Sequence, residues 1–189
     1  MDPAGPSPSA SDSVDLNEVV LALSDALDLV GVDVVQHGKR VAYMAAATGQ
    51  ASGLSRDDLS DLHLAALLHD AGVSSTRELA SILGRFEFEE AADHAGRGAS
   101  LLARFGPFSR LAEIVRLHHA SWDGPESRAA EPGVRLLGNA IFLADRVDAL
   151  LRAEEGRDVL LRSRSIRRAI AGLARARFSP RLVEAFLDV

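Results

Sequence analysis

The chain has 189 residues and a mass of 20.1 kDa, a size that fits one domain with a hydrophobic core of its own. It contains no cysteine, which excludes disulfides, thiolate zinc sites, iron–sulfur clusters and a cysteine nucleophile, and makes a reducing cytoplasm the expected compartment. The net charge of −6 argues against general binding to a nucleic-acid backbone. No apolar run is long enough for a membrane span, so no membrane partner is expected.

Residues 1–12 are rich in Pro, Ser, Gly and Ala and are expected to form a disordered tail before a single domain at 13–189. Apolar residues at helical spacing then predict three helices, at about 14–30, 33–49 and 55–70. Further helices are expected at about 76–83, 87–104, 108–120, 133–152, 157–162, 165–176 and 179–187. Because the alternation typical of strands is missing, the predicted fold class is all-α.

One polar segment, 122–133, is broken by Gly and Pro and is predicted to be the long internal loop of the domain. Long loops in compact domains are often functional, so this segment is a candidate part of a site.

Histidines and carboxylates gather at predicted helix ends. His69 and Asp70 are adjacent at the end of one apolar helix, and His118 and His119 are adjacent at the end of another. His94 lies inside a helix between these two pairs. Chance placement explains such an arrangement poorly, and imidazole with carboxylate is a ligand set for a transition metal.

Three further residues have competing explanations. Asp145 interrupts the apolar stretch 140–144 and needs either a metal or an arginine as its partner. His37 follows Asp33 by one helical turn, but alone it fits a surface or satisfied core histidine, and Asp33 fits the acid expected at a helix N-terminus. His63 is interpreted as an ordinary surface or core residue.

Taken in order, these residues resemble the HD superfamily of metal-dependent phosphohydrolases and, more narrowly, its HD-GYP branch. The resemblance runs from about residue 30 to the C-terminus. Its matching segments are His37-x-x-Arg40-Val41, Ala65-Ala66-Leu67-Leu68-His69-Asp70-Ala71-Gly72, His94-x-x-x-Gly98, Ile114-Val115-x-x-His118-His119 with Trp122-Asp123-Gly124, Ile141-x-x-Ala144-Asp145-x-x-Asp148-Ala149-Leu150, and Phe178-Ser179-Pro180.

The resemblance implies an HD-domain helical bundle around a dinuclear metal site. Its implied ligands are His37, His69, Asp70, His94, His118, His119 and Asp145, with Asp70 bridging the two metals. Asp33 matches a glutamate that holds a third metal in some members. Asp70 and His69 are the implied catalytic residues.

The implied ligand chemistry suits two divalent transition metals, with iron or manganese preferred, zinc or nickel as alternatives, and calcium excluded. Two such metals would stabilise the oxygens of an in-line attack on phosphorus, which is phosphodiester hydrolysis. By resemblance the substrate is cyclic di-GMP or a related nucleotide in bacterial signalling, with a signalling protein as a further expected partner.

Two positions depart from the family pattern. The family lysine that follows the motif aspartate by three residues is Val73 here, and the Gly-Tyr-Pro motif is missing because Pro125 directly follows Gly124. The sequence nevertheless offers replacements for the missing cation: Arg152 and Arg157 follow Asp145 by about two or three turns and are the candidate contacts to a substrate phosphate.

Two alternatives to a cyclic-dinucleotide phosphodiesterase therefore stay open. One is a non-catalytic signalling module that binds a nucleotide or a protein and keeps its metal as a structural staple. The other is an HD nucleotidase that acts on nucleoside monophosphates.

Overall fold

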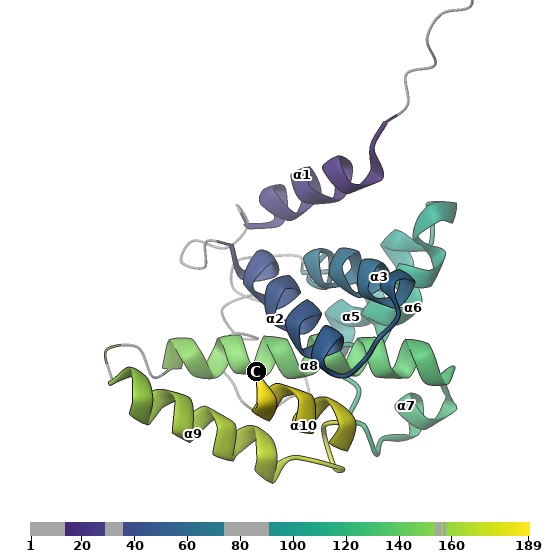
Figure 1. The fold of residues 1–189 in the computed structure, drawn as a ribbon. Coiled ribbons are helices and arrows are strands. Elements are labelled where there is room, and N and C mark those ends of the chain that lie inside the picture. Colours follow the sequence, from purple (N-terminus) through teal and green to yellow (C-terminus); the bar gives the residue numbers. More distant parts are fainter. Residues whose placement is uncertain (1–13, 29–35, 74–90, 154–155, 157) are drawn as a thin grey trace, which may run out of the picture.

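The structure, a computed structural model, describes residues 14–28, 36–73, 91–153, 156 and 158–189 (Figure 1). Helices dominate these residues, and the only β-type pairing among them is an isolated bridge between Ala174 and Phe178. The predicted all-α class is therefore confirmed.

The helices follow the predicted order along the chain, with two short additions. They are α1 (Leu16–Asp28), α2 (His37–Ala51), α3 (Arg56–Leu67), α5 (Ala91–Leu102), the 3₁₀ turn η1 (Gly106–Phe108), α6 (Ser109–Arg116), α7 (Pro125–Ala129), α8 (Pro132–Ala153), α9 (Val159–Gly172) and α10 (Pro180–Asp188). The predicted tail at 1–12 and the predicted helix at 76–83 lie outside the described residues.

Two local predictions were wrong. The separate helices expected at 157–162 and 165–176 are one continuous helix, α9, because the stretch between them holds no Gly or Pro that would break it. The loop expected at 122–133 contains the short helix α7, which begins at Pro125 because the fixed φ of proline suits the first turn of a helix.

Helix α8 lies across the middle of the fold and packs against α2, α3, α6 and α9 (Figure 1). Its central residues, 137–148, are all buried. Gly138 permits the close approach of α6, since a Cβ there would lie 2.8 Å from the Cβ of Leu117. This burial explains why α8 can carry polar side chains into the centre of the protein.

A second close approach joins the turn after α3 to α5. A Cβ on Gly72 would lie 2.0 Å from the carbonyl oxygen of His94 and 2.4 Å from the nitrogen of Gly98, so only glycine fits. The contact places the residues that end α3 directly against the helix that carries His94. None of the described helices combines the length and the apolarity that a bilayer crossing requires.

Candidate metal centre

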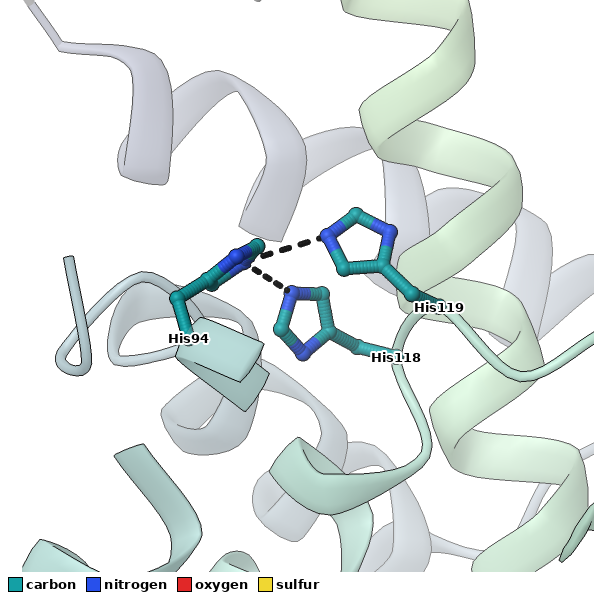
Figure 2. A group of neighbouring side chains, drawn as sticks. All are labelled: His94, His118 and His119. Carbon is teal, nitrogen blue, oxygen red and sulfur yellow. Dashed lines mark hydrogen bonds between the residues drawn. The ribbon is translucent and has the colours of Figure 1, made fainter. Parts of the chain in front are cut away.

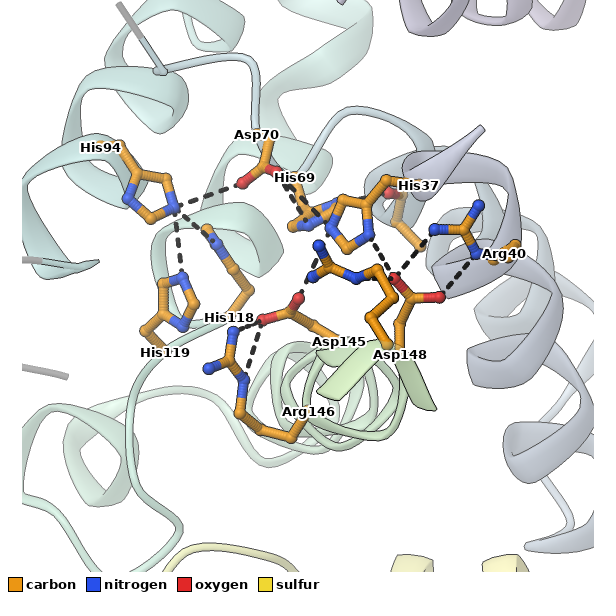
Figure 3. A network of polar contacts seen from close by, with 12 residues as sticks. His37, Arg40, His69, Asp70, His94, His118, His119, Asp145, Arg146 and Asp148 are labelled. Carbon is orange, nitrogen blue, oxygen red and sulfur yellow. Dashed lines mark hydrogen bonds and ion pairs between the residues drawn. The ribbon is translucent and has the colours of Figure 1, made fainter. Parts of the chain in front are cut away.

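Five segments converge on one buried cluster of histidines and carboxylates (Figure 3). These segments are the first turn of α2, the turn after α3, α5, the turn after α6, and the middle of α8. They bring together seven of the predicted ligands: His37, His69, Asp70, His94, His118, His119 and Asp145.

One half of the cluster, here called the first metal position, is formed by His37, His69, Asp70 and Asp145. The Nε2 atom of His37 lies 3.5 Å from Oδ1 of Asp145 and 3.7 Å from Oδ2 of Asp70. The Nε2 atom of His69 lies 3.4 Å from the same Asp70 oxygen. Four potential ligand atoms therefore face one another.

The other half, here called the second metal position, is formed by three histidines and the remaining oxygen of Asp70. The Nε2 atom of His94 lies 3.2 Å from the Nε2 atoms of both His118 and His119 (Figure 2). The same atom is 3.4 Å from Oδ1 of Asp70. Because the two oxygens of Asp70 face different halves, this carboxylate can bridge two metals.

Hydrogen bonds at the other ring nitrogen fix the orientation of several imidazoles. Nδ1 of His69 donates to the carbonyl of Ala66 at 2.8 Å, and Nδ1 of His118 donates to the carbonyl of Val115 at 2.6 Å. A carbonyl only accepts, so Nδ1 carries the proton in both rings. In a neutral ring Nε2 then presents a lone pair to the cluster, which is the state that a metal ligand needs.

Several ligand atoms of the cluster are buried without a hydrogen bond, which indicates whether these residues suit a metal. Nε2 of His37, Nε2 of His69 and Oδ1 of Asp145 are buried, and none has a hydrogen-bond partner among the described residues. Such atoms normally cost stability, and a divalent cation would satisfy all of them at once. The donor set of imidazole nitrogens and carboxylate oxygens therefore fits divalent transition metals.

Burial and neighbouring charges keep two imidazoles of the second position, His118 and His119, neutral. Burial lowers the pKa of His118 well below the usual histidine value, and the neighbouring His119 and His69 lower it further. Burial likewise lowers the pKa of His119, together with the charges of His94 and Arg146. Both rings are consequently unprotonated near neutral pH.

The carboxylates of the cluster are held in the ionised form. Burial alone would raise the pKa of Asp70, but the charge of His69 and a hydrogen bond from His94 hold it well below the usual range. Burial would also raise the pKa of Asp145, and the adjacent Arg146 guanidinium more than offsets this effect. Both groups therefore present anionic oxygens to the cluster.

Asp148 was not among the predicted site residues, yet it orients the first position. Its Oδ2 accepts a hydrogen bond of 2.8 Å from Nδ1 of His37, and Arg40 binds its two oxygens at 2.6 and 3.1 Å. A carboxylate behind a ligating histidine fixes the ring and raises its basicity. The available signal was its spacing, since Asp148 follows Asp145 by about one turn in a buried helix.

Arg146 is the second residue that sequence reasoning missed. Its side chain is 1% exposed, and its Nη2 and Nε atoms lie 2.5 and 3.2 Å from Oδ2 of Asp145. Both partners considered for Asp145 are thus accommodated: an arginine binds Oδ2, while Oδ1 faces His37 in the first position. A lone arginine inside an otherwise apolar buried stretch could have indicated this pairing.

The remaining predicted residues are placed as follows. Arg152 is half-buried in α8, and its Nε lies 3.3 Å from Oδ2 of Asp148, at the edge of the first position. Arg157 and Asp33 lie outside the described residues. His63 is exposed on α3, in agreement with its interpretation as an ordinary residue.

Comparisons with known proteins agree on one family. A family model for the HD domain matches residues 34–150. The 3′3′-cGAMP-specific phosphodiesterase 1 of Vibrio cholerae is 34% identical over 138 residues, which are 73% of this chain and 32% of that protein. The cyclic di-GMP phosphodiesterase of Thermotoga maritima is 28% identical over 180 residues, 91% of this chain and 48% of that protein.

A solved structure, that of a cyclic GMP-AMP specific phosphodiesterase from V. cholerae, has a TM-score of 0.68 at 22% identity and covers 92% of this chain and 48% of its own. That likeness establishes the shared fold. The chain thus spans between about a third and a half of the length of the proteins it matches.

Proposed function

Because this chain belongs to the HD domain family, we propose that it is a metal-dependent phosphohydrolase of HD-GYP type that cleaves the phosphodiester of a cyclic dinucleotide. One observation carries the proposal: two sets of buried, inward-facing ligand atoms share the single carboxylate of Asp70. A shared carboxylate is the feature that holds two cations close enough to act on one phosphate.

We propose iron or manganese as the metals, with zinc or nickel as alternatives. When bound, such metals supply Lewis-acid stabilisation of the phosphoryl oxygens and make water acidic enough to serve as a nucleophile. His37, His69, Asp70 and Asp145 would hold one ion, while His94, His118, His119 and the other oxygen of Asp70 would hold the second.

The residues of the chain prepare this site before a substrate arrives. Asp70 and His69 are the proposed catalytic residues, since both face the centre and would hold the metal that polarises the reacting phosphate. Arg146 immobilises one oxygen of Asp145, which directs the other toward the first position. Burial of the cluster limits competing water, so that the fixed charges act at a low effective dielectric.

A cyclic dinucleotide is the proposed substrate class, on the strength of the two relatives named for cyclic-dinucleotide hydrolysis. Its phosphates need a protein cation, and Val73 supplies none. Arg152 is the proposed contact, because its Nη2 is buried without a hydrogen-bond partner among the described residues and its Nε is already anchored at Asp148. Arg157 is proposed as a second contact, and a signalling protein as a further partner.

The test starts from purified protein reconstituted with iron or manganese without oxygen. Metal analysis should find about two equivalents, the number of bound ions that the two ligand sets accommodate. Incubation with cyclic dinucleotides and with nucleoside monophosphates should then give turnover of the cyclic compounds. Asp70→Ala should abolish that turnover, because it removes the ligand common to both positions.

Other outcomes would replace the proposal. Turnover of monophosphates alone would establish the nucleotidase alternative. Nucleotide binding with metal present but without turnover would establish the non-catalytic module, and a chain that takes up no metal would contradict the whole assignment.

A further inference from the structure

An apolar groove lies between α2, α8, α9 and α10, away from the residues of the metal centre. It encloses about 290 Å³, and its walls include Met44, Val147, Leu151, Ile166 and Phe186. No residue of the first or second metal position lines it. The apolar lining of the groove therefore needs an explanation other than phosphodiester hydrolysis.

Some of the apolar side chains that line the groove, and others next to them in the chain, face solvent. Tyr43 and Val159, which line it, are 75% and 68% exposed. Leu160 and Leu161 follow Val159 and are also exposed, and so is Val189 at the end of α10. Contiguous exposed apolar residues around a cavity are typical of a protein interaction site.

The charged side chains that line this groove, Arg162 and Arg167, are both basic. Helix α9 has four arginines and no acidic residue, although the chain as a whole has a net charge of −6. Arg167 is engaged, because it donates to the carbonyl of Leu187. Arg162 lines the groove and has no ion-pair or side-chain hydrogen-bond partner among the described residues. The groove thus presents an available guanidinium on an apolar wall.

Helix α1 has the complementary surface. All its charged residues are acidic, and Glu18 and Leu21 are exposed at positions i and i+3, which place them on one face. Val14, which precedes the helix, is exposed as well. Glu18 has no ion-pair partner among the described residues. This face pairs an exposed apolar side chain with a carboxylate, and its charge is the reverse of that of the groove with Arg162.

These two surfaces cannot meet within one molecule, because α1 lies at the opposite end of the fold from α9 and α10 (Figure 1). We propose that the groove binds α1 of a second copy of this chain, with the exposed face of α1 against the apolar walls and Glu18 paired with Arg162. A reciprocal exchange, in which each α1 occupies the groove of the other copy, closes as a two-fold dimer.

The experiment measures molecular mass in solution by light scattering and sedimentation at several protein concentrations. The unaltered chain should have twice its monomer mass at concentrations above the micromolar range. Arg162→Glu and Glu18→Arg should each give monomers, since each variant opposes two like charges. The double variant Glu18→Arg/Arg162→Glu should recover the dimer, as should an equimolar mixture of the two single variants.

Two control variants make the same charge reversals at exposed positions outside the proposed contact. Arg164→Glu alters an exposed arginine of α9 that does not line the groove, and Glu126→Arg alters an exposed acid of α7. Both should remain dimers, and circular dichroism should show equal helix content in all variants.

A monomeric unaltered chain would overturn the proposal, and so would single variants that remain dimeric. Monomeric single variants whose charge exchange fails to restore the dimer would show that some other surface occupies the groove, and would overturn the pairing with α1. None of these results depends on metal or on hydrolysis.

Discussion

The two metal positions share Asp70 but are built from different materials. The first has two carboxylates and two imidazoles. Charged side chains support two of these residues, Arg146 at Asp145 and Asp148 at His37, and the carbonyl of Ala66 supports His69. The second has one carboxylate and three imidazoles. In this position the ring of His118 is held by a hydrogen bond to the backbone carbonyl of Val115.

Because of this difference, substitutions in the two positions should have different effects on fold stability and on metal binding. The first position is more anionic and depends on a network of ion pairs that links α2 to α8, so damage to it should reach the stability of the fold. The second is built mainly from imidazoles and has no comparable ion pairs among the described residues, so damage to it should be confined to metal binding. Differences in ligand charge and softness should also give the two positions unequal affinities for a given metal.

The largest contrast is expected between Asp145→Ala and His94→Ala. Asp145→Ala leaves the buried guanidinium of Arg146 without its carboxylate, which should lower the free energy of unfolding by about 3–5 kcal/mol. His94→Ala should remove the metal at the second position while leaving the metal-free protein nearly as stable as the unaltered chain. Denaturant unfolding and metal analysis measure the two effects, and equal destabilisation by both variants would contradict the distinction.

A smaller contrast is expected from Asp148→Asn. The variant weakens the support of His37, and loss of such a supporting group typically costs about 10–100-fold in metal affinity. Only one of the two bound metal ions should be affected, because the side-chain contacts of Asp148 among the described residues are with His37, Arg40 and Arg152. Asp123→Asn, at an exposed acid paired with Arg128, is the matched control and should leave both equivalents intact. Competition with a chelator would measure the affinities.

The smallest expected effect is on the pH dependence of folding stability in the metal-free protein, which should differ between the two positions. Burial lowers the pKa of His118 in the fold, so its contribution to stability is present above the unfolded value of about 6.5 and is lost as the pH falls. Burial also disfavours the charged form of His37, but the hydrogen bond to Asp148 and the charges of Asp145 and Asp70 raise its pKa overall. Its contribution is therefore present below about pH 6.5 and is lost as the pH rises through the raised pKa.

Two variants test this opposition. Relative to the unaltered chain, His118→Gln should become more stable as the pH falls, and His37→Gln should become less stable. Urea unfolding on both sides of about pH 6.5 measures both trends. A common trend in the two variants would show that the histidines titrate as one unit.

The sequence was sufficient for the parts of the site that depend on local order. Helical periodicity established the fold class, and adjacent pairs such as His69–Asp70 marked helix ends where two side chains can meet one centre. The family order then connected these pairs to His37, His94 and Asp145, and the structure brings all of them together.

The residues that were missed act across large separations. His37 and Asp148 are 111 positions apart in the chain, so their hydrogen bond has no local signature. Arg146 is adjacent to its partner, but only the burial of α8 shows that it faces inward. The error in α9 is local, because the residues between the two predicted helices contain no Gly or Pro and continue the helix.

The contact of Gly72 with the backbone of His94 and Gly98 has a consequence for the geometry of the whole centre. It means that a contact between main chains sets how closely the helix that carries His94 approaches the turn that carries Asp70. Even one methyl group at Gly72 would clash with the backbone of α5 and would move this helix and His94 away from Asp70. The separation of His94 from Asp70 is in this sense a property of the backbone, and substitutions among the side chains of the cluster would leave it in place.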